Sequence, residues 1–415
     1  MKRIVICLDG TWNQVMNPAT VTNVVKIAQA VCPVASDGTP QVVYYNAGVG
    51  TGDLVDRILG GFFGRGLRNN VKRAYAFLSL NYAPGDEIYI FGFSRGAYTA
   101  RALAGIIGAC GILQKEHFEQ FEIAWNFYRE APKNRQGVTR HNAREAASTP
   151  DGKPSSVQEY TKMATQNRFH TAARIRCVGV WDTVGSYGIP AGFGIAALGR
   201  GLTTWMRGFH NTLFGDAIDI GLHAVAIDEK RRPFAPTFWT IKNGDTLHNN
   251  VYVEQVWFAG AHSNIGGGYP DAGLSDLAFR WMIARVTAIG RDHFGSALEF
   301  DKAIVKTHSQ PSSHGMLYRS EKKWPISRTW PYRRPLLAAS AINVRAILWN
   351  NEKRDETHIN ERLHWSVIDR LNRGGLVDGK GQGPVKYQVH LYKSQNDDIP
   401  KEKIAEHTRE EDDLA

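Results

Sequence analysis

The sequence predicts an α/β fold in which helices cover both faces of a mostly parallel central sheet. Short runs of apolar and β-branched residues alternate with longer segments of helical pattern. The strand-like runs are residues 4–9, 41–46, 86–93, 173–182 and 253–262. The helical patterns are residues 65–82 and 96–113. Apolar strands that alternate with helices are typical of a parallel sheet that is buried on both faces.

The length and composition are those of a globular protein. The chain has 415 residues, of which 43% are hydrophobic and 22% are charged. It contains no run of about 18 apolar residues, so we expect no transmembrane helix. The apolar run that follows Lys2 and Arg3 ends at Asp9, which is too short for the core of a signal peptide. The sequence therefore predicts a cytoplasmic location.

We predict one domain over residues 1–395, with a cap built from insertions at about 114–170, 189–215 and 300–340. The stretch 132–170 is polar, and we interpret it as a mobile insertion. The apolar, glycine-rich stretch 189–215 is either a pair of core helices or a lid or acyl-binding wall, since an apolar flap that opens at a lipid surface suits a lipase. The tail 396–415 is charged, and we expect it to be disordered.

Several functional classes receive no support from the sequence. The four cysteines are scattered, as expected for reduced thiols in a cytosolic protein: Cys7, Cys32, Cys110 and Cys177. The net charge of +10 is spread along the chain, apart from clusters such as 229–232 and 318–334, and we interpret it as a generally basic, solvated surface. No zinc spacing or nucleic-acid motif is present, and the glycines of 48–66 do not form a phosphate-binding loop. We expect no metal, no cofactor and no specific nucleic-acid partner.

The most informative segment is a serine between a strand and a helix. Residues 92–96, Gly-Phe-Ser-Arg-Gly, follow the strand-like run 86–93 and lead directly into an alanine-rich helical pattern. This arrangement is the nucleophile elbow of α/β hydrolases, in which Gly92 and Gly96 leave room for a tight turn. We therefore predict an α/β-hydrolase fold with Ser94 as the nucleophile. The alternative is a glycine-containing βα turn in which Ser94 only caps the helix.

A serine nucleophile needs a base, and the base needs an acid that orients it. In α/β hydrolases the chain order is Ser, then Asp or Glu, then His. Asp182 and His262 each follow an apolar run in this order, so we predict a Ser94–Asp182–His262 triad. Asp182 could instead be a helix N-cap, and His262 a structural histidine.

Other acids and histidines compete for these roles. Asp271 is close enough in sequence to His262 to be an alternative acid, although it breaks the expected order. Asp276 has the position of an N-cap or first-turn residue of a helix. His223 and Asp228 are adjacent candidates, but neither follows a clear strand-end turn.

The turn after the first strand has two interpretations. Residues 8–11, Leu-Asp-Gly-Thr, resemble the start of haloacid-dehalogenase phosphatases, but Cys7 occupies the place of their nucleophilic aspartate. Cysteine phosphatases close their loop with an arginine six residues later, where this chain has Asn13. We therefore expect Gly10 or Thr11 to donate an oxyanion-hole N–H together with Arg95, and Asp9 to hold the turn.

Several long motifs resemble those of one known family. They are residues 8–13, 44–52, 84–105, 180–186, 223–239 and 256–282. Together they are similar to the catalytic domain of the type VI secretion phospholipase effectors, a bacterial and fungal α/β-hydrolase family. The resemblance runs from about residue 2 to 285, and more loosely to about 390. It implies a triad on Ser94, Asp182 and His262, esterase activity on phospholipid acyl chains, and possible delivery by a secretion system.

Two functional hypotheses follow from the sequence. The first is a serine esterase or lipase that acts on lipid or phospholipid esters through an acyl-enzyme and contacts a membrane surface peripherally. The second is a non-catalytic protein of the same fold that binds an acyl or other small ligand, or a partner protein. The complete set of triad residues and elbow glycines favours the first. The oligomeric state is not predicted.

Overall fold

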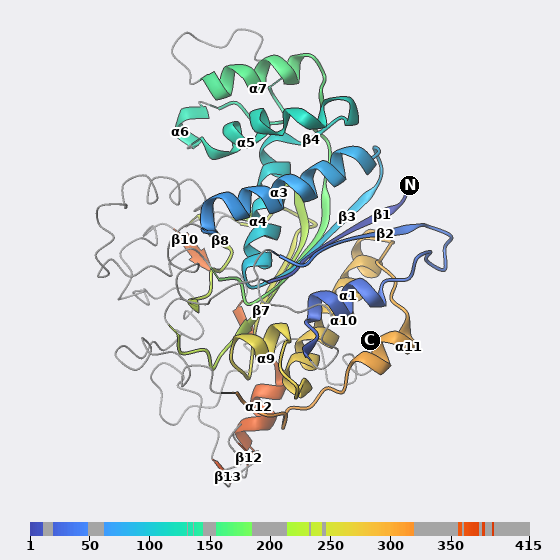
Figure 1. The fold of residues 1–415 in the computed structure, drawn as a ribbon, viewed down its shortest axis with the longest axis vertical. Helices are drawn as coiled ribbons and strands as arrows, with labels where there is room; N and C mark the ends of the chain where they lie inside the picture. The colour runs from blue at the N-terminus through green and yellow to red at the C-terminus, as the bar shows by residue number, and fades with distance from the viewer. Residues whose placement is uncertain are drawn as a thin grey trace, which may run out of the picture.

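A seven-stranded sheet forms the centre of the molecule, and every pair of neighbouring strands in it is parallel (Figure 1). The computed structural model describes residues 1–10, 20–48, 62–130, 132–135, 137–143, 155–184, 214–231, 234–242, 246–318, 356–358, 361–372, 376–377 and 384–385. In spatial order the strands are β2 (Gln41–Asn46), β1 (Arg3–Leu8), β3 (Glu87–Phe93), β6 (Ile175–Trp181), β7 (Ile218–Ala226), β9 (Tyr252–Phe258) and β11 (Glu361–Leu363).

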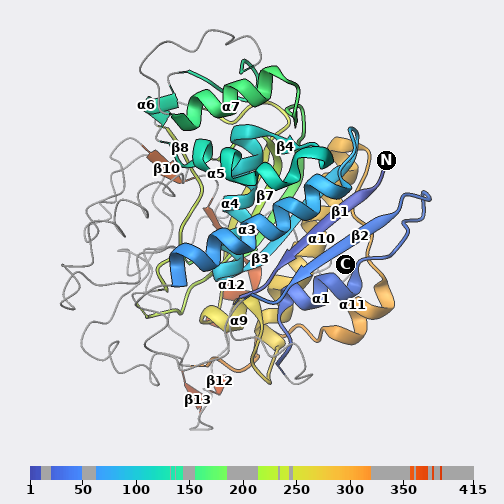
Figure 2. The same ribbon diagram turned by 45° about the horizontal axis from the view of Figure 1, so that its top comes forward.

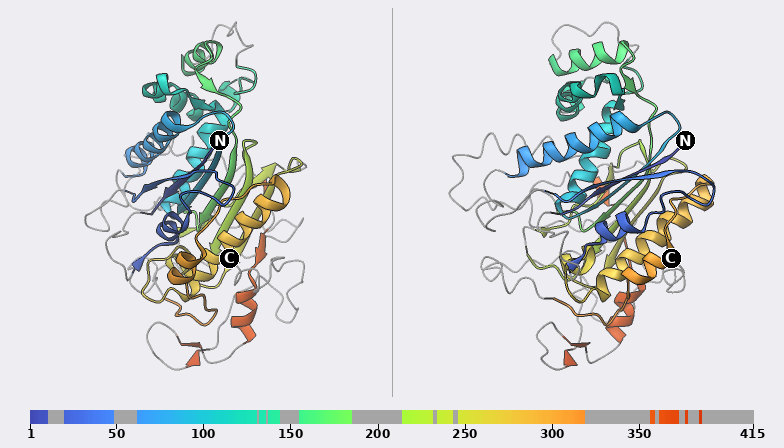
Figure 3. Two further views of the ribbon diagram at one scale, coloured as in Figure 1. Left: turned by 90° about the vertical axis from the view of Figure 1, so that its right-hand side faces the viewer. Right: turned by 45° about the vertical axis from the view of Figure 1, so that its right-hand side comes forward.

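The strands are mainly apolar because both faces of the sheet are covered. Alternate residues of β1 enter different cores: Ile4 and Ile6 belong to one, and Val5 and Cys7 to the other. On the first face lie α3 (Phe62–Asn81) and α4 (Arg95–Cys110), and on the second lie α1 (Asn23–Ala30), α10 (Gly273–Phe294) and α11 (Lys302–His308) (Figure 3). The predicted α/β architecture is confirmed.

A further helical layer packs on the far end of α4 (Figure 2). It contains η2 (Lys115–Gln120), α5 (Phe121–Arg129), α6 (Pro132–Arg135) and α7 (Ser155–Thr165), with the short antiparallel pair β4 (Ile112–Leu113) and β5 (Phe169–His170). Its contacts with α4 lie near Gly105 and Cys110, more than two helical turns from Ser94. The interpretation of 132–170 as a mobile insertion is wrong for α7, because Val157 and Tyr160 are fully buried in the core.

The remaining described elements are short and lie beyond the sheet. They are β8 (Thr240–Lys242), which pairs antiparallel with β10 (Glu356–His358), then α9 (His262–Gly266), α12 (Trp365–Asn372), β12 (Leu376–Val377) and β13 (Pro384–Val385). The predicted lid falls mostly on 189–213, and the predicted tail on 396–415; both lie outside the described residues, as does 319–340.

A buried network of charges ties the amino-terminal ends of four neighbouring strands. The carboxylate of Glu87 on β3 accepts from Arg3 on β1 at 3.1 Å and from Arg176 on β6 at 3.1 Å. Arg176 also bonds Asp219 on β7 at 2.8 Å, and the hydroxyl of Ser296 donates to Glu87 at 2.5 Å. The network lies at the edge of the sheet opposite the serine elbow, so its role is structural.

Removing the charge of Glu87 is expected to destabilise the fold. In Glu87→Gln the buried guanidinium of Arg3 and the partly exposed guanidinium of Arg176 lose their common carboxylate, and the expected loss in the free energy of unfolding is about 3 kcal/mol. Urea unfolding would measure it. Glu116→Gln is the matched control, because Glu116 faces solvent beside Lys115 with 58% of its side chain exposed. Equal stability of the two variants would contradict a structural role for the network.

Candidate active site

Ser94 lies in a strained turn between β3 and α4. Its backbone angles, φ 58° and ψ −119°, are rare for a residue with a side chain. The flanking glycines make this turn possible: a Cβ on Gly92 would come within 2.6 Å of the carbonyl oxygen of Gly96, and one on Gly96 within 2.0 Å of that of Leu8. The Ser94 side chain makes no capping hydrogen bond to α4, so the alternative that it only caps the helix is wrong.

The structure brings the three predicted triad residues together at the carboxyl edge of the sheet. The Nε2 atom of His262 lies 2.8 Å from Ser94 Oγ, and its Nδ1 atom lies 2.6 Å from Asp182 Oδ2. Ser94 follows β3, Asp182 follows β6, and His262 begins α9 just after β9. Each side chain therefore comes from the end of a different parallel strand.

The surroundings of Asp182 and His262 define how each can act. Asp182 is fully buried, has a positive φ of 41°, and accepts the Ala226 N–H on its second oxygen, Oδ1, at 2.9 Å. A carboxylate can only accept, so Nδ1 of His262 carries the proton and Nε2 is left to accept from the serine hydroxyl. The ring packs between Phe93 and Phe234, at centroid distances of 4.7 and 4.8 Å.

Burial lowers the pKa of His262 below its ordinary value of 6.5, and the hydrogen bond and charge of Asp182 offset only part of this effect. A general base must be neutral, so the role predicted for His262 requires that activity is present above this pKa and is lost as the pH falls through it. We expect the acid limb of kcat/KM for a p-nitrophenyl ester to have its midpoint below 6.5. A midpoint above the ordinary histidine value would show that Asp182 outweighs burial.

The competing residues have other partners. Asp271 accepts the Gly273 N–H at 3.0 Å at the start of α10, and no hydrogen bond joins it to His262. Asp276 lies in the first turn of α10, as predicted. His223 is buried in β7, where its Nε2 accepts the Thr183 N–H at 3.2 Å and so supports the loop that carries Asp182.

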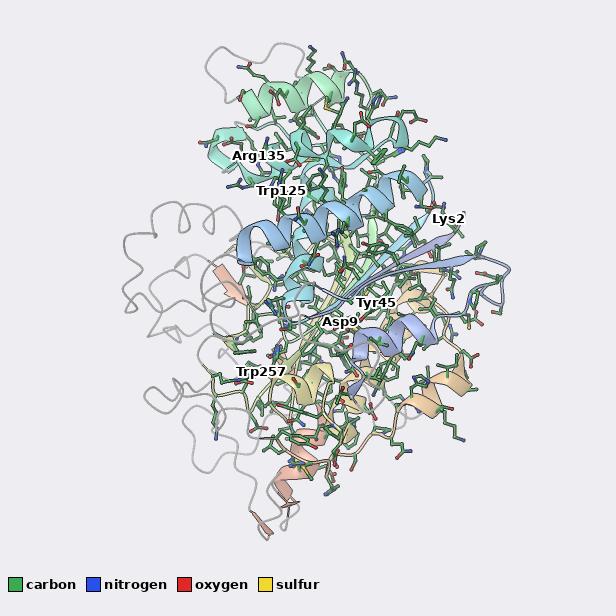
Figure 4. The ribbon with its side chains drawn as sticks, viewed as in Figure 1. Lys2, Asp9, Tyr45, Trp125, Arg135 and Trp257 are labelled. Atoms are coloured by element: carbon green, nitrogen blue, oxygen red, sulfur yellow. The ribbon has the colours of Figure 1, made fainter. Side chains whose placement is uncertain are left out.

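The turn after β1 lies against the elbow, and Asp9 holds it. The Asp9 carboxylate accepts from the Gly10 N–H at 2.7 Å, from Thr22 Oγ1 at 2.6 Å and from the Tyr45 hydroxyl at 2.9 Å, which confirms the prediction that it stabilises the turn. Figure 4 shows Asp9 and Tyr45 close together, with Lys2 at the other end of the sheet.

The three residues predicted to donate to the oxyanion are Gly10, Thr11 and Arg95. A Cβ on Gly10 would lie 3.3 Å from Ser94 Cβ, so Gly10 borders the serine, but its N–H donates to the Asp9 carboxylate. Arg95 is the first residue of α4, which places its backbone N–H at the helix start beside Ser94. Burial lowers the pKa of the Arg95 side chain to about 10. Thr11 lies outside the described residues.

One pair of residues beside His262 was not foreseen from the sequence. The backbone N–H of His262 donates to Glu229 at 3.2 Å, and Glu229 forms a bidentate ion pair with Arg231. The Glu229 side chain is fully buried, so the interpretation of 229–232 as solvated surface is wrong for this pair. Its position in the sequence could have indicated this role, because Glu229 lies three residues after the end of β7, at the same edge of the sheet as the triad.

Neither a metal site nor a membrane-spanning helix is found in the described part of the chain. Within it, no group of three or more His, Cys, Asp or Glu side chains is arranged to hold a metal ion. Nor does any helix there have the length and apolar character needed to cross a membrane.

The parallel sheet and the serine elbow define an α/β-hydrolase fold. Residues 2–285 match the family model described as the type VI secretion system phospholipase effector Tle1-like catalytic domain. The chain belongs to this family.

More distant similarities accompany this match. The uncharacterized protein YEL023C of Saccharomyces cerevisiae is 29% identical over 258 residues, which are 58% of this chain and 33% of that protein. The chain thus spans about a third of the length of that relative. A crystal structure of an uncharacterized protein from Pseudomonas aeruginosa aligns over 75% of this chain and 49% of its own, with 17% identity and a TM-score of 0.44. A structure of the Tle1 effector bound to the VgrG spike of the type VI secretion system aligns over 65% of this chain and 51% of its own, with 17% identity and a TM-score of 0.29.

Proposed function

We propose that the protein is a serine hydrolase that cleaves carboxylic esters, with phospholipid acyl esters as its substrate class. The observation that carries this proposal is the hydrogen-bonded series Ser94–His262–Asp182 at the carboxyl edge of the sheet. Membership of a phospholipase effector family supports the lipid substrate. Contact with a membrane surface and delivery by a secretion system are proposed from the family alone.

In the proposed mechanism, Ser94 Oγ attacks the ester carbonyl while its proton passes to Nε2 of His262. Asp182 holds the opposite nitrogen of the ring and stabilises the imidazolium that forms. The imidazolium then gives its proton to the leaving alcohol, and an acyl-enzyme remains on Ser94. A water molecule, deprotonated by His262, attacks the acyl group, and the fatty acid leaves as the proton returns to Ser94.

The tetrahedral oxyanion needs donors that face the attacked carbonyl. We assign this role to the backbone N–H groups of Arg95 and Thr11, because the Gly10 N–H is occupied by Asp9. Asp9 then acts on the turn and not on the substrate. One such donor typically contributes about 3 kcal/mol to transition-state stabilisation.

Phosphatidylcholine vesicles and p-nitrophenyl esters test the proposal together. We expect the purified chain to release fatty acid and lysophospholipid, with no phosphorylated headgroup in the products, and Ser94→Ala to release neither. Cleavage of p-nitrophenyl esters without phospholipid cleavage would retain the esterase and remove the lipid assignment. Release of a headgroup, or no hydrolysis of either substrate, would overturn the proposal. If neither substrate is hydrolysed, the alternative of a non-catalytic binding protein would be favoured.

A further inference from the structure

We propose that Glu229 and Arg231 form a positioning pair for His262, which fixes the backbone and ring of the base and keeps its surroundings electrically balanced. The proposal rests on the proposed hydrolase function, because it assigns residues that act through its base. Neither residue is placed in contact with substrate.

The Glu229 carboxylate is the centre of the pair. Its side chain is fully buried and accepts several hydrogen bonds. Arg231 donates its backbone N–H at 2.8 Å, Nε at 2.9 Å and Nη2 at 2.8 Å, and His262 donates its backbone N–H. A buried carboxylate is tolerated only when it is paired and hydrogen-bonded in this way. The pair therefore anchors the first residue of α9 to the segment that follows β7.

Arg231 also reaches the imidazole through an aromatic ring. Its guanidinium lies over Phe234, 3.7 Å from the ring centroid. Phe234 in turn packs edge-on against the His262 ring, at a centroid distance of 4.8 Å. The side chain of Arg231 is only 12% exposed, so its guanidinium is largely shielded from water. One ion pair thus holds both the backbone and the ring of His262.

The charges of the pair have opposite effects on His262. The charge of Arg231 lowers the pKa of His262, and that of Glu229 raises it. For Arg231, burial lowers the pKa, but the hydrogen bonds and charge of Glu229 outweigh it, so this pKa stands above its ordinary value. Other titratable groups also lie near the site. Asp182 bonds the imidazole ring, and Asp228 accepts the Gly260 N–H. Arg95 follows Ser94 in the chain, and the charge of Tyr269 raises the pKa of Arg231.

This opposition gives a test that a purely structural role would not satisfy. The rate at which a fluorophosphonate labels Ser94 depends on neutral His262, so its acid limb reports the pKa of that residue. We expect Glu229→Gln to move the limb to lower pH, because an unbalanced guanidinium remains. Arg231→Met is expected to move it to higher pH, because an unbalanced carboxylate remains. The double variant is expected to return it close to the parent position.

Turnover of a p-nitrophenyl ester gives a second readout. Each single substitution is expected to lower kcat by about 10- to 100-fold through misplacement of the base, while KM changes little. Glu254→Gln is the matched control, because Glu254 forms a similar bidentate pair with Arg285 near the opposite end of β9. This control should leave both the acid limb and kcat unchanged.

The outcomes separate this proposal from the proposed function. Shifts of the two single variants in the same direction, or no shift in either, would overturn the positioning pair while labelling of Ser94 still supports the hydrolase. Absence of labelling in the parent protein would overturn the hydrolase itself. If one single variant does not fold, the test uses the acid limbs of the other two proteins. A shift of the remaining single variant in the expected direction, with the limb of the double variant close to that of the parent, would support the pair, and any other result would overturn it.

Discussion

Replacing Ser94 by alanine is expected to lower ester hydrolysis by about 10⁴-fold or more, to a rate close to that of the remaining binding site alone. The hydroxyl lies 2.8 Å from the base, and no acyl-enzyme can form without it. His262→Ala should have a similar effect, because the serine then loses its proton acceptor. Steady-state kinetics on a p-nitrophenyl ester would measure both losses.

The two losses should not add. Because nucleophile and base act as one unit, the double variant is expected to be about as slow as either single variant. Ser79→Ala is a suitable control, since Ser79 is a buried serine of α3 whose hydroxyl donates to the Tyr75 carbonyl of the same helix. An additive loss in the double variant, or activity in Ser94→Ala, would contradict the assigned mechanism.

Replacing Asp182 by asparagine is expected to lower turnover by about 10⁴-fold without unfolding the protein. Ala226 N–H requires an acceptor at Oδ1, which directs the amide oxygen there and leaves the NH₂ group facing His262. His262 must then accept at Nδ1 and carry its proton on Nε2, so it can no longer take the serine proton. Turnover and thermal unfolding should be measured on the same preparation.

Asp271→Asn is the matched comparison for the acid. Asp271 accepts the Gly273 N–H at the start of α10, and the side-chain oxygen of asparagine can accept the same bond, so we expect turnover near that of the parent. If Asp271→Asn lost its activity while Asp182→Asn kept it, Asp182 would be the wrong acid.

The sheet and the triad geometry could be anticipated because they depend on local patterns. Apolar runs indicated strands buried on both faces, and the spacing of Gly92 and Gly96 indicated a turn that excludes side chains at both places. Parallel strands bring their carboxyl ends to one edge of a sheet. Residues that follow β3, β6 and β9 therefore meet, although 168 positions separate Ser94 from His262.

Other features depend on tertiary contacts that the sequence does not show. β7 was not predicted, because Asp219 and His223 interrupt its apolar pattern; both are buried, and each has its own partner. Glu229 resembles a solvated charge until the chain folds it beside Arg231 and His262. The Gly10 N–H was a reasonable oxyanion donor, but a nearby carboxylate competes for it, and only the turn geometry decides between them.

The central claim is that Ser94 is an activated nucleophile, and covalent labelling tests it most directly. The folded protein would be treated with a fluorophosphonate, digested, and mapped by mass spectrometry. The account predicts one adduct, on the peptide that contains Ser94, and its loss in both Ser94→Ala and His262→Ala. No adduct on folded protein, or an adduct on another residue that survives Ser94→Ala, would contradict it.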